Sequence, residues 1–176
     1  MTTKHLFACI AFLFTPLVIG QHMTLKDGNK IPATAEWEFI CENYALTGVA
    51  FVQIGKAEKG GWLQITAAAT DARFYIGGVV YVYLDDHTAL VCTDKLLRQN
   101  KDGQMTAWYF FTDAEIARLK KSNIQSIRFN VRGTASSFSS QTGNFTAVNK
   151  KTYFSVGQHR PQEHETAAAL YQLYQP

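Results

Sequence analysis

The segment spanning residues 104–133 constrains the fold most, because strand, helix and strand patterns follow one another in it without a gap. Alternation through residues 105–111 places apolar or aromatic side chains on both faces, which predicts a strand covered on both sides. Thr112 and Glu115 then match a capping box, in which each side chain accepts a hydrogen bond from the backbone amide of the other. The pattern therefore predicts a short helix over about residues 113–122.

From residue 124 the period returns to two, which predicts a second strand with one buried and one solvated face. Arg128 and Arg132 both fall on the solvated face, because residues four apart in a strand share a face. They form a candidate ligand-binding pair for an anion. The alternative is an ordinary solvated face whose charges only favour solubility, and simple alternation with a polar outside favours this second interpretation.

Strand patterns separated by turn signals fill most of the remaining chain, and no repeat or change of composition indicates a second domain. Residues 100–103 match a hairpin turn that would join the strand at residues 89–92 to the strand at 105–111. Apolar residues at helical spacing predict a C-terminal helix over residues 162–174. We therefore predict a mainly β domain for residues 34–176: an antiparallel β-sandwich or partly open barrel with one short inter-strand helix and a C-terminal helix.

The N-terminal residues differ from this domain. Lys4 precedes an apolar run, so residues 1–20 resemble a secretory signal peptide that is cleaved before Gln21. We expect export to the periplasm or the cell exterior, with no stable membrane span after cleavage. An uncleaved anchor is the alternative, although the apolar run is short for a span. Residues 21–33 are polar and contain Asp27-Gly28, which predicts a flexible leader or a turn.

The charge of the chain excludes some classes of partner. Loss of residues 1–20 removes Lys4 and no acidic residue, which leaves 16 basic and 14 acidic side chains. A nearly neutral chain without Lys or Arg clusters argues against a nucleic-acid partner. The sequence contains no phosphate-binding loop, dinucleotide fingerprint or zinc-ligand spacing, so we assign no cofactor, no metal site and no catalytic residue.

Two cysteines, Cys41 and Cys92, remain after removal of the signal peptide, and both fall on apolar phases of predicted strands. In an oxidising compartment they are candidates for a disulfide. The alternative is two buried free thiols that act as small apolar residues. The sequence leaves both open, because a bridge depends on a Cα separation that spacing along the chain does not give.

Tyr81 and Tyr83 are candidate ligand-binding residues. They share one face of a predicted strand, while Val80, Val82 and Leu84 share the other. If the valine face is buried, the tyrosines form an exposed ridge suited to a protein or glycan partner. If the C-terminal helix covers the tyrosine face, they belong to a second apolar layer. We favour the covered arrangement, since the apolar stripe of that helix needs a partner.

The sequence thus favours an exported, non-catalytic binding or interaction protein whose ligand is unknown. One alternative is a small secreted hydrolase or metal-dependent enzyme built from Asp85, His87 and the glutamates of residues 36–42. An exposed row of carboxylates does not by itself shift their pKa values apart, and turn chemistry explains Asp85 more simply. The other alternative is a structural or inhibitor module that uses the Ser-rich loop at residues 134–142 as its contact element.

Overall fold

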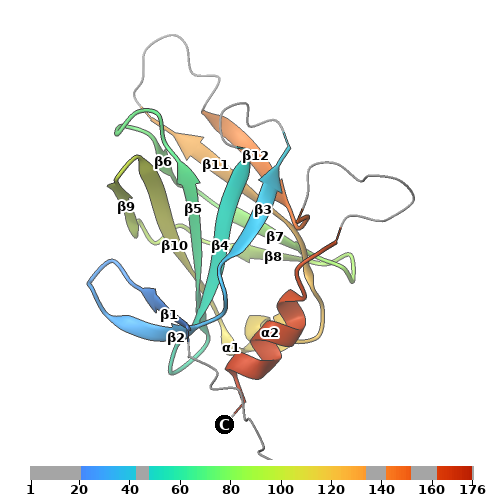
Figure 1. Ribbon diagram of the computed structural model, residues 1–176. Coiled ribbons are helices and arrows are strands. Elements are labelled where there is room, and N and C mark those ends of the chain that lie inside the picture. Colours follow the sequence, from blue (N-terminus) through green and yellow to red (C-terminus); the bar gives the residue numbers. More distant parts are fainter. Residues whose placement is uncertain (1–20, 43–47, 134–141, 152–161, 176) are drawn as a thin grey trace, which may run out of the picture.

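The structure is a computed structural model that describes residues 21–42, 48–133, 142–151 and 162–175. In this part of the chain it is a mainly antiparallel β fold with one large curled sheet and two helices (Figure 1). The predicted signal peptide lies outside the described residues, as does nearly all of the Ser-rich loop at residues 134–142. The strands are β1 (Gln21–Thr24), β2 (Lys30–Ala33), β3 (Trp37–Cys41), β4 (Val49–Lys56), β5 (Gly61–Ala68), β6 (Tyr75–Ile76), β7 (Val80–Leu84), β8 (Ala89–Cys92), β9 (Arg98–Lys101), β10 (Gln104–Phe111), β11 (Ile124–Arg132) and β12 (Gly143–Val148).

The sheet has the strand order β8-β7-β11-β12-β3-β4-β5-β10-β9, and all recorded pairings are antiparallel. Off this path, β6 pairs with β11, and β2 pairs with both β1 and β4. The sheet curls into a half-barrel around its apolar inner face (Figure 1). This confirms the predicted class, an antiparallel β-sandwich or partly open barrel with one inter-strand helix and a C-terminal helix.

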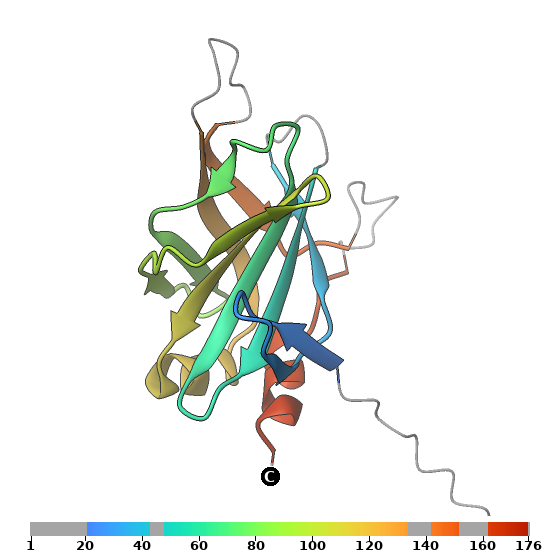
Figure 2. The same cartoon turned by 90° about the vertical axis from the view of Figure 1, so that its left-hand side faces the viewer.

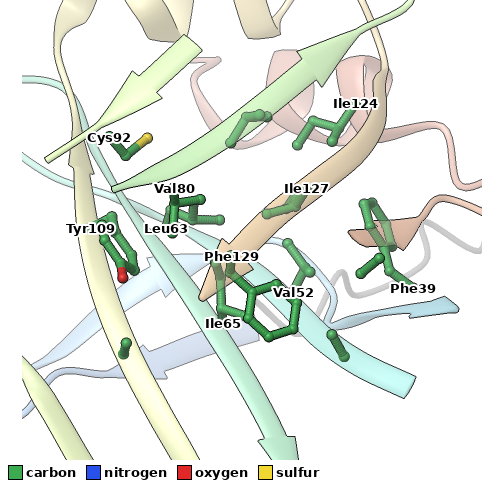
Figure 3. Close-up of a cluster of buried hydrophobic side chains, with 14 of the residues drawn as sticks. Phe39, Val52, Leu63, Ile65, Val80, Cys92, Tyr109, Ile124, Ile127 and Phe129 are labelled. Atoms are coloured by element: carbon green, nitrogen blue, oxygen red, sulfur yellow. The ribbon is translucent and has the colours of Figure 1, made fainter. Parts of the chain in front are cut away.

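Apolar side chains from nearly every strand fill the inside of the half-barrel (Figure 3). They come from the alternate positions that face inward, such as Leu63 and Ile65 on β5 and Ile127 and Phe129 on β11, and each of these four is at most 2% exposed. Full burial of one such side chain stabilises a fold by roughly 1.5–3 kcal/mol. The interior is therefore a packed core, and any ligand site has to lie on the outside or at a rim.

The two ends of the curled sheet approach each other at a seam that side chains close. The Tyr109 hydroxyl on β10 donates a hydrogen bond to the Gly78 carbonyl, just before β7, at 3.2 Å. The Asn100 amide on β9 donates to the carbonyls of Ala72, at 2.8 Å, and Phe74. Because these bonds replace a backbone ladder between the sheet ends, the barrel is partly open.

The predicted helix is present as α1 (Asp113–Leu119), which ends about one turn earlier than expected. The capping box is confirmed: the Glu115 amide donates to the Thr112 hydroxyl at 3.3 Å, and the Thr112 amide donates to the Glu115 carboxylate at 2.7 Å. Although α1 joins β10 to β11, four strands separate these two in the sheet. The segment at residues 104–133 therefore crosses one end of the half-barrel instead of forming a pair of adjacent strands.

The C-terminal helix, α2 (Thr166–Leu173), lies beside α1 at the same end of the half-barrel (Figure 1). Leu170 is fully buried in the main core. The Thr166 hydroxyl accepts a hydrogen bond from the Ile124 amide at 2.8 Å, and the Tyr174 hydroxyl donates to the Gly60 carbonyl at 2.7 Å. The helix therefore covers the end of the core and does not lie on an outer sheet face.

Residues 21–33 form the β1–β2 hairpin, so the prediction of a flexible leader is wrong, whereas its alternative, a turn at Asp27-Gly28, is present. The hairpin lies against the outside of the sheet (Figure 2). Met23 is 1% exposed. Gly55 makes this packing possible, because a Cβ there would stand 2.5 Å from the Ile31 Cδ1 atom and 3.1 Å from the Met23 sulfur. Apolar residues at alternate positions, Met23 with Leu25 and Ile31 with Ala33, are the pattern in the sequence that could have predicted these two strands.

The prediction placed the turn before β10 correctly, but it assigned the wrong strand to the other side of that turn. Asp102 and Gly103 have φ values of 53° and 73°, as a two-residue hairpin turn requires. The turn joins β10 to β9, a separate strand over Arg98–Lys101, and not to β8. The intervening residues cross from one edge of the sheet to the other, and a polar strand such as Arg98–Lys101 lacks the apolar alternation that predicts a strand.

Candidate functional site

Three of the four predicted ligand-binding residues lie together on the outer face of β7 and β11. Val80, Val82 and Leu84 are fully buried, so Tyr81 and Tyr83 point outward. Tyr81 is 39% exposed, and the two tyrosine rings stack with centroids 6.5 Å apart. The favoured prediction that the C-terminal helix covers these tyrosines is wrong, because the apolar stripe of α2 finds its partner at the end of the core.

Arg128 on β11 stands directly opposite Tyr81 on β7, and Ser126 stands opposite Tyr83. Arg128 is exposed, and no ion pair or hydrogen bond of its side chain is recorded among the described residues. The exposed guanidinium therefore lies beside an aromatic ridge, an arrangement that suits protein interfaces, where Tyr and Arg are enriched.

Arg132 lies on the same face but farther along β11. Its Nε donates to the Asn130 Oδ1 at 3.0 Å, and its guanidinium lies so close to Gly78 that a Cβ there would meet Nη2 at 2.7 Å. Four residues along a strand span roughly 13 Å. Arg128 therefore borders the tyrosines, whereas Arg132 lies beside Asn130 and Gly78.

Exposed aliphatic side chains surround the tyrosines. Val91 on β8 stands opposite Tyr81 and is 53% exposed, and Val79, directly before β7, is 42% exposed. We call Val79, Tyr81, Tyr83 and Val91 the Tyr81 patch. Three of its members, Val79, Tyr81 and Val91, are among the five exposed large apolar side chains in the described part of the chain, and Leu96, in the loop after β8, is a fourth. The fifth, Tyr171, lies on α2.

The loop after β8 is tied to the start of β7. Asp94 accepts hydrogen bonds from the Gly78 amide and the Leu96 amide, both at 2.7 Å. Leu96 has a φ of 58°, a left-handed conformation that is strained for a residue with this side chain. Such strain persists only where surrounding contacts impose it. The result is that Leu96, 63% exposed, is held in a fixed conformation in the loop that Asp94 ties to the start of β7.

The residues of the predicted enzyme alternative lie on the surface. Asp85 and His87 are exposed in the β7–β8 turn, where Asp86 accepts hydrogen bonds from the Thr88 amide and hydroxyl. These bonds hold the pKa of Asp86 below its usual value. Burial, and secondly the charge of Glu38, raise the pKa of Glu36. Within the described ranges, the structure records no hydrogen bond from His87 to a carboxylate and no cluster of metal-ligating side chains.

The candidate disulfide between Cys41 and Cys92 is not formed. The two thiols are separate and buried on β3 and β8, with three strands between them in the sheet. Figure 3 shows Cys92 on one side of the core and Phe39, which precedes Cys41 by two residues, on the other. A bridge requires Cα atoms within about 7 Å. Burial raises the pKa of each thiol to about 12.

A second site, which sequence reasoning missed, is a cleft of about 370 Å³ between the turn of the β1–β2 hairpin and the outer sheet face. We call it the tryptophan cleft. The Trp108 indole donates to the Gln64 Oε1 at 2.9 Å, and the Trp62 ring packs edge-on against Phe110 at a centroid distance of 5.1 Å. The sequence pattern could place both tryptophans on an outer face of the sheet, but it did not predict the hairpin that lies opposite them. The cleft is lined by Leu25, Lys26, Asp27, Trp62, Leu97 and Trp108.

Comparisons with protein-family models, with curated proteins and with solved structures gave no significant match. Neither helix in the described ranges is long and apolar enough to cross a membrane. The case for a function therefore depends on the geometry of the Tyr81 patch and of the tryptophan cleft.

Proposed function

We propose that the protein is an exported, non-catalytic interaction protein that binds a protein partner through the Tyr81 patch. The observation that carries the proposal is the concentration of exposed large apolar side chains on β7, β8 and the loop after them. Single exposed apolar residues are ordinary on a soluble protein, whereas a group of them on one face is typical of an interaction surface.

The magnitude of the apolar contribution indicates the size of the interface. Val79, Tyr81, Val91 and Leu96 are each about half exposed. Covering the exposed part of each contributes roughly 1 kcal/mol, about half the value for full burial. A sum of about 4 kcal/mol corresponds to a dissociation constant near 1 mM. The patch is therefore the centre of a larger contact, of the order of 800 Å² on each partner, as in specific protein complexes.

Arg128 indicates what the partner presents. It lies opposite Tyr81 at the border of the patch, with no recorded ion pair among the described residues. A desolvated guanidinium needs a partner, so a bound protein should place a carboxylate against it. The aliphatic members of the patch favour a protein over a glycan, since Val79 and Val91 offer a sugar hydroxyl no hydrogen bond.

The test compares matched variants in a quantitative pull-down from the native envelope and medium. Tyr81→Ser with Val91→Ser removes apolar contact, and Arg128→Glu reverses the charge. The controls are Tyr171→Ser and Lys121→Glu, which change an exposed tyrosine and an exposed cation outside the patch.

We expect the patch variants to capture at least tenfold less of the partner than the wild type does, and the control variants to capture the same amount as the wild type. Sedimentation of the purified chain establishes beforehand whether the partner is a second copy. Equal loss in patch and control variants, or loss in neither set, would refute the proposal. If the patch variants instead lose a captured glycan, the ligand of the Tyr81 patch is a glycan and not a protein.

A further inference from the structure

We propose that the tryptophan cleft binds a small amphipathic carboxylate, with an apolar body against the indoles and an anionic head at Lys26. This site shares no residue with the Tyr81 patch: Trp62 of β5, Trp108 of β10, the turn of the β1–β2 hairpin and Leu97 in the loop before β9 line the cleft, whereas the patch lies on β7, β8 and the residue before β7.

The size and composition of the cleft set the body of the ligand. A volume of about 370 Å³ lies within the range of small-molecule sites. At about 30 Å³ for each water molecule, roughly a dozen non-hydrogen atoms fill it. Four of the six lining residues are Leu or Trp, so the body that fits is an alkyl chain or an aromatic ring system.

The polar groups of the cleft set the head. Asp27 already uses both carboxylate oxygens: Oδ1 accepts from the Asn29 amide at 3.0 Å, and Oδ2 accepts from the Asn29 side chain at 2.7 Å. For the Lys26 ammonium and the Trp62 indole N–H, no acceptor is recorded among the described residues. The groups without a recorded partner are therefore donors, and one of them is cationic, which makes them complementary to a carboxylate.

The walls of the cleft are held in place before any ligand binds. Trp108 is 5% exposed and is fixed by its bond to Gln64, and Trp62 rests against Phe110. On the other side, Met23 and Ile31 seat the hairpin over Gly55. A rigid site loses little conformational entropy on binding, which favours affinity for a ligand of this small size.

The test is a tryptophan-fluorescence titration of the full chain with three probes that each carry a ten-carbon chain: decanoate, 1-decanol and decyltrimethylammonium. Trp62 and Trp108 line the cleft, while Trp37 is 4% exposed in the main core and supplies a constant background. We expect decanoate to bind most tightly and decyltrimethylammonium least. Lys26→Gln should weaken decanoate roughly five- to tenfold, as for loss of a charge-assisted hydrogen bond, and leave 1-decanol unchanged.

Two further variants complete the test. Lys30→Gln, on β2 of the same hairpin, is the charge control and should leave decanoate binding unchanged. Trp62→Leu should reduce the fluorescence response to the part that Trp108 contributes, while the thermal transition shows that the chain is still folded. The proposal is overturned if no probe binds, if 1-decanol binds as tightly as decanoate, or if Lys26→Gln has no effect. Tyr81→Ser should not alter the titration, so this proposal and the proposed function fail independently.

Discussion

Replacing Asn149 with alanine should destabilise the fold by about 3 kcal/mol. Asn149 is 1% exposed. Its Nδ2 donates to the Ile124 carbonyl at 2.8 Å and to the His164 carbonyl at 2.9 Å, and its Oδ1 accepts from the His164 amide at 2.8 Å. It therefore connects the start of β11, the end of β12 and the segment before α2.

The magnitude follows from the groups that lose their partner. A buried polar group left unsatisfied costs roughly 1–3 kcal/mol. The bond to Ile124 is fully buried, whereas the two bonds to His164 are partly buried, and water can replace part of their contribution. We therefore count the first at about 2 kcal/mol and the other two together at about 1 kcal/mol.

The assay is urea denaturation of the two variants Asn149→Ala and Asn144→Ala against the wild type. Asn144 is the matched control, because it is exposed on β12 and, among the described residues, its side chain accepts one hydrogen bond, from the Asn130 side-chain amide at 3.3 Å. We expect Asn149→Ala to lower the thermal midpoint by roughly 6–12 °C as well, and Asn144→Ala to change stability by less than about 0.5 kcal/mol. A loss below about 1 kcal/mol for Asn149→Ala would refute the reasoning.

Three further outcomes follow from local contacts. Thr112→Ala should cost about 1 kcal/mol of stability by removing the helix cap, measured by urea denaturation, and Glu115→Gln should cost less because its amide oxygen still accepts. Burial lowers the pKa of His164, so the unfolded state binds the proton more tightly than the folded state does. The free energy of unfolding should therefore fall as the pH drops below about 6.5. His164→Phe should remove this pH dependence from the unfolding curves. Cys41 and Cys92 should resist alkylation in the folded protein and both react in urea without reductant, whereas a protected pair in urea would indicate a bridge.

Local pattern predicted the elements whose causes lie close together in the chain. The capping box of α1 and the alternation of β11 depend on neighbours within a few residues, and both are present as expected. The outward phase of Tyr81 was also readable, because Val80 and Val82 define the buried face. The fold class followed from these elements and from the turns between them.

The features that the sequence did not predict depend on contacts between residues far apart in the chain. Whether Tyr81 is exposed depended on where α2 docks, and Leu170 docks at the end of the core. The β1–β2 hairpin depends on Gly55, more than twenty residues later, which accommodates the side chain of Ile31. The tryptophan cleft exists only once that hairpin is placed, so Trp62 could be assigned to an outer face but not to a site.

The proposed function requires that a protein partner bind over the Tyr81 patch. The most direct measurement is photo-crosslinking with p-benzoylphenylalanine at position 81 and, in a separate chain, at position 171, which is 59% exposed on α2. Both chains are irradiated in the native envelope and medium. We expect one discrete crosslinked species from position 81, reduced by Arg128→Glu, and none from position 171. The same adducts at both positions, or none at position 81, would contradict it.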